Sequence, residues 1–157
     1  MNSSELMHST FVIEREYPVS PERVYRAFED PAQKRKWHAE GKGSNLVEYS
    51  LEFRVGGTEK TVSTFGPGLP LPEGTEMIGL STYQYLVPGS RIVFAYTMTV
   101  GGNCISASLA TIELFPSGTG TRLKFTDQGA YFEGADGPQM RSFGWESILA
   151  NLGEFLK

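Results

Sequence analysis

The chain has few of the side chains that most metal and covalent chemistry requires. It contains a single cysteine, Cys104, and only two histidines, His8 and His38. One cysteine excludes an intramolecular disulfide framework and a cysteine-rich zinc module. The two histidines stand far apart in the sequence, which argues against a histidine-based metal site. We therefore predict no metal site and no cofactor.

Long apolar runs and an excess of positive charge are also lacking. No run approaches the roughly 20 apolar residues of a membrane-spanning helix. Residues 1–10 have neither the basic nor the apolar region of a signal peptide. The formal net charge of −4 favours neither nucleic acid nor an anionic membrane as a partner. We expect a cytoplasmic protein that binds neither.

The composition suits one well-packed domain. Of the 157 residues, 39% are hydrophobic and 12% are aromatic. A chain of this size buries about two-thirds of the surface that its unfolded form exposes, so it needs no disulfide or metal to fold. We expect residues 1–9 to form a polar leader and residues 10–157 to form a single domain.

The order of elements is read from periodicity and from start signals. Alternation of apolar and polar residues predicts a strand over 10–17. Ser20-Pro21 and Asp30-Pro31 each place a capping residue before a proline, which predicts two short helices. Strands separated by glycine- and proline-rich turns then indicate an antiparallel meander. The predicted strands of this meander are 46–53, 58–65, 75–87, 91–100, 104–115 and 121–130.

A long helix is predicted over residues 138–157. It would extend about 30 Å and carries a wide apolar stripe that includes Phe143, Trp145 and Leu149. Gly144 and Gly153 interrupt the stripe, and we expect them to let the sheet approach closely. The predicted fold class is α+β, with a seven-stranded antiparallel sheet wrapped around this helix and two short helices after the first strand. A strongly bent sheet cannot meet one helix everywhere, so we expect a cavity between them.

Several motifs in this order are shared with a known group of proteins. FVIER at 11–15 precedes PVSPERVYRAF at 18–28, and Trp37 ends the second short helix. FRVGG at 53–57, GTGTRL at 118–123 and Gly144-Trp145 follow. This arrangement resembles the helix-grip fold of the START-like (SRPBCC) superfamily, which includes polyketide cyclases and Bet v 1-like proteins. Within it the chain is similar to the branch named for the activator of Hsp90 ATPase.

The resemblance leaves three functions open. The first is binding of a small hydrophobic or aromatic molecule between the sheet and the C-terminal helix. The second is an enzyme of the polyketide cyclase or aromatase type. The third is an interaction protein related to the Hsp90 co-chaperones. Because the polar candidates are scattered along the sequence, we favour binding. The predicted partner is a small hydrophobic ligand, with a homodimer left open.

Aromatic and methionine side chains give the best functional signal, because they suit a flat apolar ligand. Strand alternation places Tyr83 and Tyr85 on the same face of their strand, and Tyr96 and Met98 on the same face of the next strand. Either set could equally be ordinary core. The predicted ligand-binding residues are Trp37, His38, Arg54, Tyr83, Tyr85, Tyr96, Met98 and Trp145.

Two of these residues, and the cysteine, have simpler alternatives. Arg54 could bind a carboxylate or enolate oxygen, or it could pair with Glu52 or Glu59. His38 could act as a general base, or it could be an exposed histidine at a helix C-terminus. Cys104 has no visible base beside it, so we assign it a structural role.

Overall fold

Seven antiparallel strands form one open sheet in the order β1-β7-β6-β5-β4-β3-β2. The computed structural model describes residues 5–40 and 44–157. The strands are β1 Met7–Tyr17, β2 Ser44–Leu51, β3 Thr58–Phe65, β4 Glu76–Val87, β5 Arg91–Val100, β6 Asn103–Ser117 and β7 Gly120–Tyr131. The helices are α1 Pro21–Glu29, α2 Pro31–Lys34, the π-helical turn η1 Arg35–Ala39 and α3 Pro138–Phe155. The predicted helix-grip architecture is confirmed.

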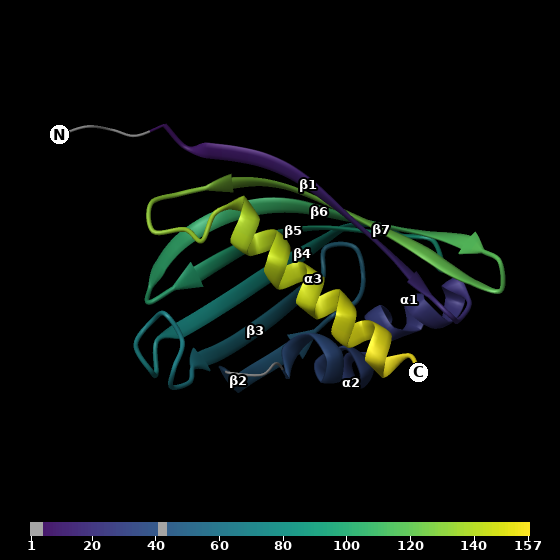
Figure 1. Cartoon of the computed structure of the whole chain (residues 1–157), viewed down its shortest axis with the longest axis horizontal. Coiled ribbons are helices and arrows are strands. Elements are labelled where there is room, and N and C mark those ends of the chain that lie inside the picture. Colours follow the sequence, from purple (N-terminus) through teal and green to yellow (C-terminus); the bar gives the residue numbers. More distant parts are fainter. Residues whose placement is uncertain (1–4, 41–43) are drawn as a thin grey trace.

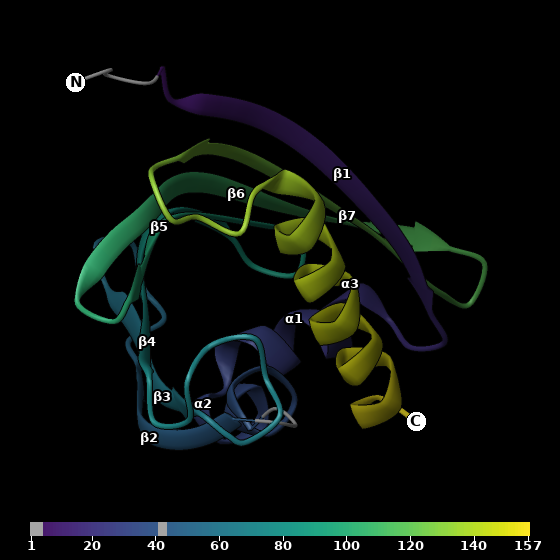
Figure 2. The ribbon, with the colours of Figure 1, turned by 60° about the vertical axis from the view of Figure 1, so that its left-hand side comes forward.

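The sheet curls around α3, which crosses its concave side (Figure 1). Figure 2 shows the same curvature along the sheet, with α1 and α2 inside the curve, on the same concave side as α3. No helix in the described part of the chain is long and apolar enough to cross a membrane.

The two short helices begin where the capping signals predicted. The side chain of Ser20 accepts a hydrogen bond from the Arg23 backbone N–H at 3.2 Å, and Pro21 is the first helical residue. Asp30 accepts one from the Ala32 backbone N–H at 2.9 Å. Each cap satisfies an N–H group that the first helical turn leaves without a partner. The chain therefore bends between α1 and α2 instead of forming one long helix.

Strand β1 begins earlier than the sequence pattern predicted. Met7 pairs with Tyr131, and pairing continues without interruption to Tyr17 and Thr121. Residues 7–9, which we had assigned to the polar leader, are thus part of the sheet. Backbone hydrogen bonding to β7 holds them there and does not depend on their side chains, so their polarity gave no sign of it.

A β-bulge in β4 changes the direction of one predicted ligand residue. Tyr83 pairs with Phe94 and Tyr85 pairs with Val93, so Gln84 is an extra residue between them. Tyr83 faces the concave side and is 1% exposed, whereas Tyr85 is 49% exposed. The prediction that these tyrosines share a face is wrong, because a bulge inverts the alternation that follows it.

Helix α3 packs against the sheet both near its start, through Arg141 and Trp145, and in its C-terminal half, but it leaves open space beside Gly144. The Tyr17 hydroxyl donates to the Leu149 carbonyl oxygen at 2.8 Å. A methyl group on Gly153 would lie 3.4 Å from the Tyr17 ring, but one on Gly144 would meet nothing within 4 Å. Gly153 therefore permits the predicted close approach, and Gly144 faces open space.

The buried face of α3 is narrower than predicted. It comprises Arg141, Trp145, Leu149 and Leu152, whereas Phe143 is 67% exposed. Phe143 precedes Trp145 by two residues, and residues two apart do not share a helix face.

Candidate functional site

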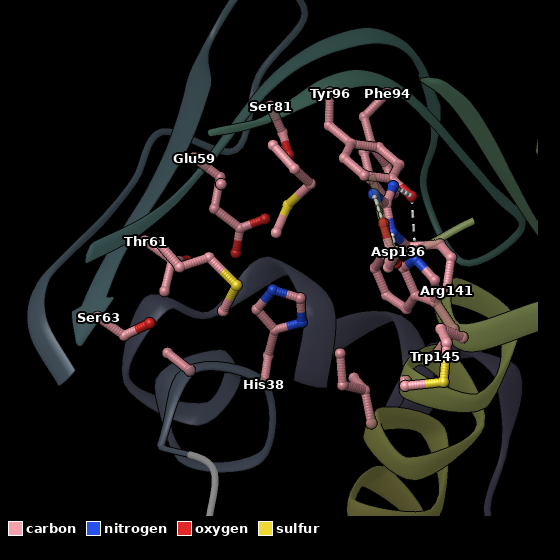
Figure 3. Close-up of a pocket in the computed structure, with 17 residues that line it drawn as sticks. His38, Glu59, Thr61, Ser63, Ser81, Phe94, Tyr96, Asp136, Arg141 and Trp145 are labelled. Atoms are coloured by element: carbon pink, nitrogen blue, oxygen red, sulfur yellow. Dashed lines mark hydrogen bonds and ion pairs between the residues drawn. The ribbon is translucent and has the colours of Figure 1, made fainter. Parts of the chain in front are cut away.

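The open space beside Gly144 is a pocket of about 330 Å³ (Figure 3). Strands β3, β4 and β5 form one side of it, and η1 and α3 form the other. The residues that line it are His38, Ala39, Glu59, Thr61, Ser63, Met77, Gly79, Ser81, Phe94, Tyr96, Met98, Asp136, Met140, Arg141, Gly144, Trp145 and Ile148.

The pocket has a polar wall and an aromatic wall. The polar wall comes from β3, whose alternation directs Glu59, Thr61 and Ser63 inward. Opposite them lie the aromatic side chains of β5 and α3 (Figure 3).

Glu59 is a buried carboxylate whose two oxygens both have partners. The Lys34 ammonium lies 2.7 Å from Oε1, and both side chains are almost fully enclosed. Tyr83 donates to Oε1 at 3.3 Å, and Tyr49 donates to Oε2 at 2.6 Å. Burial by itself would raise the pKa of Glu59, but Lys34 and these hydrogen bonds outweigh it and hold the pKa below its usual value. Glu59 is therefore ionised at neutral pH.

His38 lies on the floor of the pocket, in the π-helical turn. Its ring centroid is 5.8 Å from that of Trp145. The Nδ1 atom is fully buried and has no hydrogen-bond partner among the described residues. Burial lowers the pKa of His38 to about 4, against an opposing influence of Glu59. The ring is thus neutral at pH 7, and it is not the exposed histidine of the simpler alternative.

The hydroxyl of Tyr96 is at the centre of a second buried network. It donates to Asp127 Oδ2, and it accepts from Trp145 Nε1 at 3.1 Å and from an Arg141 nitrogen at 3.3 Å. A phenol has one hydrogen to donate and two lone pairs to accept with. The Tyr96 hydroxyl is therefore saturated, and only its ring is available to a ligand.

Most of the donor groups of Arg141 are also engaged. Its Nε and one terminal nitrogen each lie 2.9 Å from an oxygen of Asp136, a bidentate pair. The same terminal nitrogen donates to Ser106 Oγ at 2.8 Å, and the other donates to Tyr96. A guanidinium has five N–H groups, and four of them are used here. Arg141 fixes the pocket wall and is not a free cation for a ligand.

The structure brings together four of the eight predicted ligand residues, namely His38, Tyr96, Met98 and Trp145. Trp37 and Tyr83 are buried behind the wall, where Trp37 Nε1 donates to the Ala27 carbonyl oxygen.

Arg54 and Tyr85 lie outside the pocket. Arg54 makes an exposed ion pair with Glu52 at 3.2 Å, which was the simpler alternative. Tyr85 is turned outward by the bulge at Gln84.

Sequence reasoning missed the residues that give the site its electrostatics. Glu59, Lys34, Asp127 and Arg141 are charged residue types that are ordinarily exposed. The one local signal was Glu59 itself, because it begins the alternation that continues through Thr61 and Ser63. Within residues 5–40 and 44–157, no three His, Cys, Asp or Glu side chains converge to hold a metal ion.

A curved antiparallel sheet closed over a long C-terminal helix, with a pocket between them, defines a helix-grip protein. The family described as "Activator of Hsp90 ATPase homolog 1-like protein" matches residues 18–157. The chain belongs to this family, as the sequence motifs indicated.

Solved structures of similar proteins share the whole fold. The chain is 46% identical to the Mll3558 protein of Rhizobium loti, with 97% of this chain and 99% of that one covered and a TM-score of 0.83. It is 35% identical to a protein of Rhizobium leguminosarum, with 97% and 96% covered and a TM-score of 0.87.

A more distant structure shares the fold alone. DynU16, a protein in the dynemicin biosynthetic locus, is 17% identical, with 94% of this chain and 46% of that one covered and a TM-score of 0.65. None of the curated proteins matches the chain.

Proposed function

We propose that the protein binds a small, mainly apolar aromatic molecule in the pocket between β3–β5, η1 and α3. The observation that carries this proposal is the pocket beside Gly144, where the helix residue has no neighbour within 4 Å and the surrounding lining is rich in aromatic side chains. A volume of about 330 Å³ lies within the range of small-molecule sites, roughly 300–1,000 Å³. Phe94, Tyr96 and Trp145 offer ring surfaces for a flat ligand.

Binding is favoured over catalysis by the arrangement of the polar groups. A cyclase-like reaction would need a cation or an acid that converges with His38 on one point of the ligand. Arg54 lies outside the pocket, and Arg141 is held by Asp136. The Tyr96 hydroxyl has no hydrogen left to donate. The fold shared with DynU16 adds no argument for a reaction, because one fold supports many activities.

The interaction-protein alternative lacks a comparable feature. It would need a contiguous apolar patch on the surface. The large apolar side chains that are about half exposed or more come from β1, β2, the β2–β3 turn, β4 and α3; they are Met7, Val12, Val47, Val55, Tyr85, Met140 and Phe143.

The proposal is tested by filling the pocket from the helix. Binding of the uncharged fluorescent dye N-phenyl-1-naphthylamine to wild-type protein should be saturable, with one site per chain. Gly144→Phe should weaken it by about tenfold or more, because the new ring enters space where the glycine has no neighbour within 4 Å. Ala150→Phe, at an exposed position of the same helix, is the matched control and should leave dye binding unchanged.

A second variant fills the pocket from the sheet. Met98→Trp enlarges a side chain that lines the pocket, and it too should abolish dye binding while the far-UV circular dichroism stays native. Unchanged affinity for N-phenyl-1-naphthylamine in both Gly144→Phe and Met98→Trp would overturn the proposal. So would a wild-type protein that binds no dye.

A further inference from the structure

We infer that the ligand of this pocket is an uncharged aromatic molecule with a carbonyl oxygen, and that the Nε2–H group of His38 donates a hydrogen bond to that oxygen. This inference rests on the proposed function and names the chemical class of the ligand.

The first step concerns the tautomer of His38. A neutral imidazole carries one hydrogen, on either Nδ1 or Nε2. Nδ1 is enclosed by protein and has no partner, so a hydrogen there would be a buried N–H group that nothing can satisfy. Buried N–H groups without a partner are rarer in proteins than unsatisfied acceptors. The hydrogen is therefore assigned to Nε2, and Nδ1 keeps only a lone pair.

The second step concerns the direction of the ring. His38 lines the pocket, and its Nδ1 edge is closed off. The edge that includes Nε2 is therefore presented to the pocket, on the side of Glu59 and Thr61 (Figure 3). Within the described ranges, no side chain accepts a hydrogen bond from this ring, so a ligand oxygen would be its acceptor.

The third step excludes an anionic ligand. Glu59 lines the pocket as an ionised carboxylate. Its cation, Lys34, is already 2.7 Å from Oε1, and the guanidinium of Arg141 is paired with Asp136 at 2.9 Å. A carboxylate ligand would lose its hydration and meet a like charge, with no free cation among the described lining residues.

The fourth step excludes a cationic ligand. Both oxygens of Glu59 already accept hydrogen bonds, from Lys34 and Tyr83 on Oε1 and from Tyr49 on Oε2. A cation placed there would be repelled by the Lys34 ammonium. A neutral carbonyl compound avoids both penalties and satisfies the free donor of His38.

The experiment compares three probes of similar shape by isothermal titration calorimetry. Acetylnaphthalene has the carbonyl, ethylnaphthalene lacks the oxygen, and naphthoate is an anion. Wild-type protein should bind acetylnaphthalene about three- to tenfold more tightly than ethylnaphthalene, the usual effect of one net hydrogen bond. It should bind naphthoate more weakly than acetylnaphthalene.

Two variants assign the preference to His38. His38→Leu should bind both neutral probes with equal affinity, because it has no donor. His38→Gln places an amide N–H close to the position of Nε2 and should restore the preference. The carbonyl stretch of bound acetylnaphthalene, followed by infrared spectroscopy, should shift to lower frequency in wild-type protein and in His38→Gln but not in His38→Leu.

The outcomes separate this inference from the function on which it rests. If wild-type protein and His38→Leu show the same preference for acetylnaphthalene, or if naphthoate binds most tightly, the inference is wrong while binding stands. If His38→Leu does not fold, the wild-type protein alone still tests the inference. An unshifted carbonyl stretch of acetylnaphthalene bound to wild-type protein would overturn the inference. If wild-type protein binds neither neutral probe, the proposed function fails together with it.

Discussion

The ammonium nitrogen of Lys34 lies 2.7 Å from Oε1 of Glu59, with both side chains less than 5% exposed. Helix α2 supplies the lysine and β3 supplies the glutamate, so this pair joins the short helices to the sheet at the polar wall of the pocket. Removing two charges from water costs several kcal/mol per ion, and their attraction and hydrogen bonds offset that cost only while both partners are present.

Lys34→Met should therefore be strongly destabilising. It leaves the Glu59 carboxylate buried without its cation and should lower the free energy of unfolding by about 3–5 kcal/mol, measured by urea denaturation. The double variant Lys34→Met/Glu59→Leu removes both charges and should recover much of the loss. Arg54→Met, which breaks an exposed ion pair, serves as the control and should change stability by about 1 kcal/mol or less. Equal effects of Lys34→Met and Arg54→Met would contradict the prediction.

Tyr96→Phe should destabilise the domain without changing its shape. The variant removes the only described donor to Asp127 Oδ2 and the acceptor of the Trp145 and Arg141 hydrogen bonds. Leaving such buried groups unpaired costs about 1–3 kcal/mol. Tyr85→Phe, at an exposed position, should be nearly neutral. Urea denaturation followed by far-UV circular dichroism measures both, and a neutral Tyr96→Phe would show that water replaces the lost hydroxyl.

The fold could be predicted because its strands, helices and turns are each defined by signals that lie within a few residues of one another in the sequence. Alternation defined the strands, Ser20 and Asp30 began the helices, and glycine-rich turns separated the hairpins.

The site depends on relationships that the sequence does not reveal locally. The extra residue Gln84 inverts the side chains that follow it, so Tyr85 could not be placed from alternation alone. Lys34 and Glu59 are 25 residues apart and meet only because α2 folds under β3. Each is an ordinary surface residue type until the fold buries it.

The stability of the protein should fall as the pH is lowered toward 4, in part because of His38. Its pKa is about 4 in the folded protein and about 6.5 in an unfolded chain. Between these values the unfolded state binds a proton that the folded state does not, and protonation therefore favours unfolding.

The size of this effect can be measured against His38→Gln, which cannot titrate. Between pH 7 and pH 5, wild-type protein should lose roughly 2 kcal/mol of unfolding free energy relative to the variant. The buried Asp127, whose pKa is raised by burial, contributes in the opposite direction, but it is present in both proteins and cancels in the difference. Parallel stability curves for the two proteins would show that the pKa of His38 is the same in the folded and unfolded states.

Two large apolar residues of α3, six positions apart, should respond very differently to truncation. Leu149 is fully buried, so Leu149→Ala should cost about 2–5 kcal/mol through lost contacts and the cavity that remains. Phe143 is 67% exposed, and Phe143→Ala should stay within about 0.5 kcal/mol of wild type. A large loss in Phe143→Ala would mean that this face of α3 is covered in solution by a second copy of the chain. In that case the melting temperature of wild-type protein should rise with protein concentration, because association stabilises the folded state by mass action. A melting temperature independent of concentration, together with a neutral Phe143→Ala, is the expected result.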